Sequence, residues 1–97
     1  MSFETFCQSV DNDKAPEVNI YLRALWFDKK GNWDKAHKIA QDIENHDGSW
    51  IHAYLHRKEG DHSNASYWYH RAGKFVPAGT LNDEWVNLVK HFLNYGK

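Results

Sequence analysis

The residues best suited to chemistry are two histidines on one predicted helix. His52 and His56 are four positions apart, so their imidazole rings share one helical face. Glu59 follows one turn later, and His62 lies just past the next turn. Two imidazoles and a carboxylate suit a divalent transition metal. The alternative interpretation is that His52 and His56 are exposed or packed histidines without a metal.

Other kinds of site chemistry find no support in the sequence. The remaining histidines His37, His46, His70 and His91 show no recognisable spacing. All six glycines fall near predicted helix ends, so the chain has no glycine loop for a phosphate and no dinucleotide fingerprint. No serine nucleophile motif occurs either. We therefore expect no catalytic residues, no enzymatic activity and no cofactor.

Composition narrows the class of protein further. A chain of 97 residues allows one domain, spanning residues 1–97. Its net charge of −1 is spread along the chain, so nucleic acid and membranes are not expected as partners. Cys7 is the only cysteine, which excludes an internal disulfide and a thiolate metal cage. Because residues 1–10 lack a secretion signal and no segment is apolar enough to span a membrane, the expected location is the cytoplasm.

Glycine, proline and capping residues divide the chain into helices. Pro16 suits the first turn of a helix, whereas Asp47 and Gly48 indicate a break. Thr80 and Asp83 form a capping signal before the clearest amphipathic pattern. Six helices are predicted. Four have both ends assigned, at residues 3–10, 16–30, 49–59 and 61–74. The other two begin after Asn32 and after Thr80. The predicted fold is all-α, with two antiparallel helical hairpins, a short N-terminal helix and a C-terminal capping helix.

The two predicted hairpins carry the same small residues at the same spacing. Ala24, Gly31 and Ala36 recur 29 residues later as Ala53, Gly60 and Ala65. Such a period is typical of stacked helical hairpins, which bury a core by packing on one another. The spacing resembles the tetratricopeptide repeat, and the run from Ala65 to Gly73, ASYWYHRAG, is similar to the end of a Sel-like repeat. The resemblance covers two repeats, about residues 17–75.

This resemblance implies a concave surface, formed by the first helix of each repeat, that holds a protein or peptide. Carried over position by position, the surface comprises Tyr21, Leu25, Asp28, Trp50, Tyr54, Arg57 and Lys58. Trp, Tyr and Arg often carry binding energy at interfaces, although Trp50 and Tyr54 could instead pack in the core. We expect a non-catalytic interaction module whose partner is a protein or peptide. A second copy of the chain is one such partner, which would give a homo-oligomer. The alternative is a helical metal-binding protein that uses His52 and His56.

Overall fold

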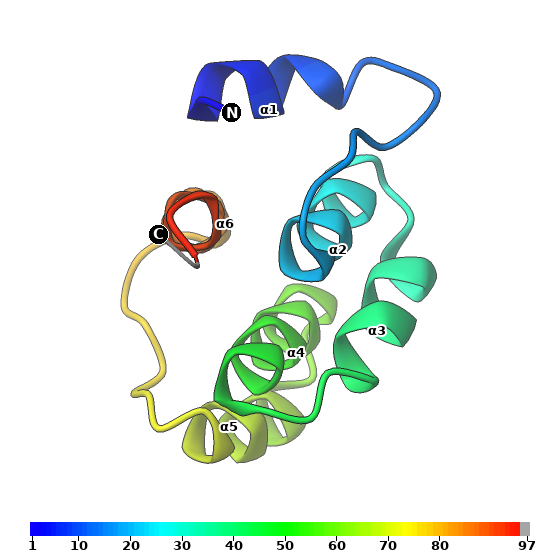
Figure 1. The fold of residues 1–97 in the computed structure, drawn as a ribbon. Coiled ribbons are helices and arrows are strands. Elements are labelled where there is room, and N and C mark those ends of the chain that lie inside the picture. Colours follow the sequence, from blue (N-terminus) through cyan, green and yellow to red (C-terminus); the bar gives the residue numbers. More distant parts are fainter. Residues whose placement is uncertain (96–97) are drawn as a thin grey trace.

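A computed structural model describes residues 1–95, which form six helices and no strand (Figure 1). The helices are α1 (Phe3–Ser9), α2 (Ile20–Lys29), α3 (Trp33–Gln41), α4 (His46–Glu59), α5 (His62–Arg71) and α6 (Leu81–Leu93). The predicted all-α fold class is therefore confirmed. None of the helices in this described part is long and apolar enough to cross a membrane.

The recurring glycines end α2 and α4 in the same way. Gly31 and Gly60 have φ angles of 93° and 88°, a left-handed conformation that glycine adopts without steric cost. The following residues, Asn32 and Asp61, accept hydrogen bonds from backbone N–H groups in the first turns of α3 and α5. The chain therefore reverses within a few residues, and α2 packs on α3 as α4 packs on α5.

The four recurring alanines are buried where the helices meet. They are Ala24, Ala36, Ala53 and Ala65. Small side chains at these positions allow the helix backbones to approach closely. Helix α4 is central, because it packs against α2, α3, α5 and α6. Its fully buried Ile51 and Leu55 join Leu25, Phe6 and the apolar side of α6 in the main core.

Helix α6 packs beside α2 and α4, and α1 packs against it (Figure 1). The predicted capping box is present: Asp83 N–H donates to Thr80 Oγ1, and Thr80 N–H donates to the Asp83 carboxylate. The buried apolar residues of α6 share one face of the helix, as expected from the amphipathic pattern after Thr80; they are Trp85, Leu88, Val89 and Phe92. The C-terminal helix thus covers the side of α2 and α4 that faces away from α3 and α5 (Figure 1).

Three predicted helix boundaries were wrong. Helix α2 begins after Asn19, whose side chain caps it, so Pro16 lies in an extended segment outside the helix. Helix α4 begins at His46 because Asn45 accepts a hydrogen bond from Gly48 N–H. Asp47 and Gly48 therefore lie in its first turn, where the acidic side chain of Asp47 interacts favourably with the positive end of the helix dipole. Helix α5 ends at Arg71, before the predicted residue 74.

Candidate functional site

Three histidines from two helices meet between α3 and α4. His37 comes from α3, and His52 and His56 come from successive turns of α4. One ring nitrogen from each residue lies within 4.8 Å of the other two. His52 and His56 are buried, with exposed fractions of 5% and 7%, and His37 is half-buried. We call these three residues the histidine cluster.

Hydrogen bonds fix the orientation of the cluster rings. The Nε2 atoms of His37 and His52 are 2.9 Å apart, so one of the two donates to the other. His56 Nδ1 lies 2.8 Å from Glu59 Oε2, which leaves His56 Nε2 free of this pairing. A carboxylate on one imidazole nitrogen holds the ring and makes the opposite nitrogen a better metal ligand.

Two tryptophans form the walls of the cluster. Trp33 stacks on His37 with ring centroids 4.8 Å apart, and Trp68 stacks on His52 at 4.0 Å. Trp33 Nε1 also donates to the carbonyl of Leu55 at 2.8 Å, which ties α3 to α4 beside the cluster. The histidines therefore lie in an aromatic environment that limits their contact with water.

The surroundings of the cluster disfavour protonated imidazole. Burial, with a smaller contribution from the neighbouring His37 and His56, lowers the pKa of His52 to about 4. Burial and the nearby His56 also lower the pKa of His37, although Glu59 and Asp34 oppose the shift. At neutral pH both rings are therefore uncharged and have lone pairs available for a metal.

This low pKa predicts that acid destabilises the metal-free protein. In the unfolded chain His52 is protonated below the ordinary histidine pKa of 6.5. In the folded chain it is protonated only below about pH 4. Stability from this residue is complete above pH 6.5 and is lost as the pH falls. Between pH 7.5 and 5 we expect a loss of about 2 kcal/mol, measured by urea unfolding. A His52→Gln variant should show a smaller loss; an equal loss would place the titrating group elsewhere.

The structure brings together only part of the predicted metal set. His52 and His56 lie side by side, with ring centroids 4.7 Å apart. Glu59 contacts His56 rather than completing a ligand set, and His62 is exposed outside the cluster. His37 was missed because it belongs to a different helix. Its place next to Ala36, the small residue of the repeated pattern, could have indicated that it lies at the α3–α4 contact.

The residues predicted to bind a partner lie mostly beneath α6. Tyr21 stacks on Phe92 at a centroid distance of 4.5 Å with nearly parallel rings. Leu25 is fully buried, and its carbonyl accepts a hydrogen bond from Trp85 Nε1 at 3.1 Å. Trp50 is half-buried, and its ring centroid lies 6.2 Å from that of Phe92. The chain's own C-terminal helix thus occupies this part of the predicted surface.

The polar residues of the same surface form two internal ionic groups. Asp28 is buried and accepts hydrogen bonds from Tyr54 Oη at 2.7 Å and Lys58 Nζ at 2.8 Å. Burial and the Asp28 charge raise the pKa of Tyr54, so this phenol stays a donor. Tyr54 is therefore core, the second of the two interpretations left open by the sequence.

The second group surrounds Glu84 of α6. Its carboxylate accepts hydrogen bonds from Arg57 at 2.9 Å and Trp50 Nε1 at 3.2 Å, and Tyr69 Oη lies within 2.7 Å of both oxygens. Arg57 also donates to the carbonyl of Gly79, just before α6. Three of the predicted binding residues therefore hold parts of this chain: Trp50 and Arg57 hold α6, and Lys58 holds Asp28. Partner binding at this surface stays a prediction, and a partner would have to displace α6 from the part that it covers.

Comparison with known proteins adds no relative from which a function could be carried over. No family model, curated protein or solved structure matches the chain. The tetratricopeptide resemblance therefore stays a hypothesis, and the structure shows an all-α fold with a cluster of three histidines.

Proposed function

We propose that the chain is a metal-binding protein whose histidine cluster holds one divalent transition metal ion, with zinc as the best fit. The observation that carries this proposal is the convergence of three imidazole nitrogens within 4.8 Å of one another. A tetrahedral zinc ion with nitrogen ligands at about 2.0–2.1 Å would require them to lie about 3.3 Å apart. Side-chain rotations that move the ring nitrogens by about 1 Å would achieve this spacing.

The donor chemistry supports the same proposal. Three imidazole nitrogens suit Zn²⁺, Cu²⁺ or Ni²⁺, whereas Mg²⁺ and Ca²⁺ prefer oxygen ligands. The low pKa of His52 means that its ring is neutral at neutral pH, so a metal competes with no imidazolium charge there. The ion would replace the hydrogen bond between His37 and His52, and the proton of that bond would move to the Nδ1 atom of the same ring. Glu59 supplies the carboxylate that commonly supports a metal-bound histidine through its other nitrogen.

The nearby cations do not oppose a metal ion. Arg57 and Lys58 follow His56 directly in the sequence, but their charges are paired with Glu84 and Asp28. These pairs lie toward α6 and α2, whereas the cluster faces α3. The charged group closest to the cluster is the Glu59 carboxylate, which favours a cation.

A metal at this position would join the two hairpins. His37 belongs to the first hairpin, and His52 and His56 belong to the second. One ion held by all three residues would stabilise the α3–α4 contact. Three protein ligands would also leave a fourth position for water or another small ligand, an arrangement common in zinc sites that react with bound molecules.

Zinc binding provides the direct test. We expect metal-free protein to take up one equivalent of Zn²⁺ at pH 7.5 in isothermal titration calorimetry. The melting temperature should rise with zinc concentration, because the ion binds the folded chain preferentially. Replacement of two ligands in the variant His52→Ala, His56→Ala should weaken binding by about 100-fold or more.

A matched control separates the cluster from nonspecific histidine binding. His62→Ala, His70→Ala removes two exposed histidines outside the cluster and should retain full zinc affinity. The single variant His37→Ala should also lose affinity, since His37 is part of the proposed ligand set. Equal zinc uptake by all variants, or none by the wild type, would overturn the proposal.

A further inference from the structure

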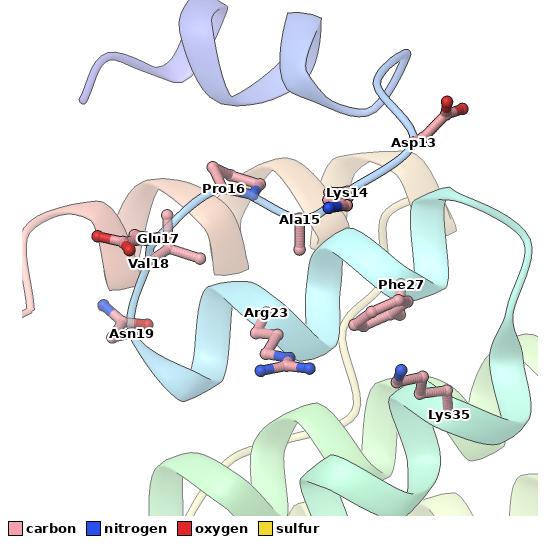
Figure 2. Close-up of a pocket in the computed structure, with 10 residues that line it drawn as sticks. All are labelled: Asp13, Lys14, Ala15, Pro16, Glu17, Val18, Asn19, Arg23, Phe27 and Lys35. Atoms are coloured by element: carbon pink, nitrogen blue, oxygen red, sulfur yellow. The ribbon is translucent and has the colours of Figure 1, made fainter.

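A concave region lies apart from the histidine cluster, and none of its lining residues belongs to that cluster. It is formed by the non-helical segment between α1 and α2 together with side chains of α2 and α3 (Figure 2). Its lining residues are Asp13, Lys14, Ala15, Pro16, Glu17, Val18, Asn19, Arg23, Phe27 and Lys35. We call it the segment pocket.

Two cations of the segment pocket lie near the same aromatic ring. The guanidinium carbon of Arg23 lies 5.6 Å from the centroid of the Phe27 ring, and Lys35 Nζ lies 4.4 Å from the same centroid. Figure 2 shows both charged ends directed toward the space below the ring. In the described part of the chain, neither cation forms an ion pair or a side-chain hydrogen bond.

The acidic residues of the rim do not neutralise these charges. The carboxylates of Asp13 and Glu17 point away from Arg23 and Lys35 (Figure 2). Other lysines show the contrast: Lys58 is paired with Asp28, and Lys30 Nζ donates to the carbonyls of residues 10 and 12, which anchors the start of the segment. Asp42 lines a neighbouring hollow together with Arg23, but it forms no ion pair with it in the described part of the chain.

We infer that the segment pocket binds a small oxyanion, a phosphate or carboxylate group, between Arg23 and Lys35. Two like charges beside one aromatic ring repel each other, and an anion bound by both would offset that repulsion. Arg23 can offer two parallel N–H donors to an oxyanion, and Lys35 can act as a point charge. Their contacts with Phe27 keep both side chains near the space that the anion would fill.

The test is a titration of metal-free, isotope-labelled protein with inorganic phosphate and, separately, with citrate at constant ionic strength. We expect saturable shifts of the NMR signals of Arg23, Phe27 and Lys35 in at least one titration. Saturation by phosphate alone would assign a phosphoryl ligand, by citrate alone a carboxylate ligand, and by both an oxyanion of either kind.

Two variants of α3 make the outcome specific. Lys35→Gln should weaken the binding about three- to fivefold, the value of one exposed charge pair. Lys38→Gln removes the same charge from an exposed position outside the pocket and should leave the affinity unchanged. Both residues are exposed, so both variants should fold. Shifts that do not saturate, or equal weakening by the two substitutions, would overturn the inference.

Discussion

Glu84→Ala should lower the free energy of unfolding by about 3–5 kcal/mol, as expected when one partner of a buried ion pair is removed. The Glu84 side chain is only 3% exposed, and its carboxylate accepts hydrogen bonds from Arg57, Trp50 and Tyr69. Its removal leaves the guanidinium of Arg57 without a counter-charge and the phenol of Tyr69 without an acceptor. Urea unfolding followed by tryptophan fluorescence measures the loss.

A surface carboxylate provides the control for Glu84. Glu44→Ala removes an exposed residue that forms no ion pair in the described structure and should change stability by less than about 0.5 kcal/mol. Glu84→Gln keeps the shape but removes the charge, so its cost should lie between those of the two alanine variants. A loss at Glu84→Ala as small as that at Glu44→Ala would show that the Glu84 group does not hold α6 in solution.

Local signals made the helices predictable. Gly31 and Gly60 end two helices, and Asn32, Asp61 and Thr80 begin the next ones, all through contacts within a few residues. The start of α4 was predicted three residues too late, although it is also set by capping, because Asn45 is as good a cap as Asn32. Several capping residues in succession leave the choice of helix start to packing.

Tertiary contacts decided the features that the sequence did not reveal. His52 and His56 share a helix face and could be paired by spacing, but His37 joins them only through the packing of α3 on α4. The amphipathic pattern of α6 was clear, yet no local signal indicates which surface an amphipathic helix covers. The position of Glu84 on that helix, opposite Arg57 and Tyr69, becomes meaningful only once α6 is docked.

The docking of α6 gives the second large prediction. Phe92→Ala should lower the free energy of unfolding by about 3–5 kcal/mol, the usual cost of truncating a buried phenylalanine. Phe92 is fully buried and stacks on Tyr21, and its carbonyl accepts a hydrogen bond from Asn19, the cap of α2. Thermal unfolding by circular dichroism measures the effect. Phe75→Ala, at a side chain that is 96% exposed, should leave stability unchanged.

The same variant tests whether the surface of α2 and α4 can bind a helix from another molecule. In the wild type α6 covers this surface, so a synthetic peptide with the sequence of residues 80–95 should have no effect. In Phe92→Ala the docked state of α6 is weakened, and the peptide should raise the melting temperature in proportion to the logarithm of its concentration. A peptide in which Phe92 and Glu84 are both alanine is the control, since it lacks the two side chains that anchor α6. Stabilisation by the native peptide alone would support the binding surface predicted from the repeat pattern, and stabilisation by neither peptide would count against it.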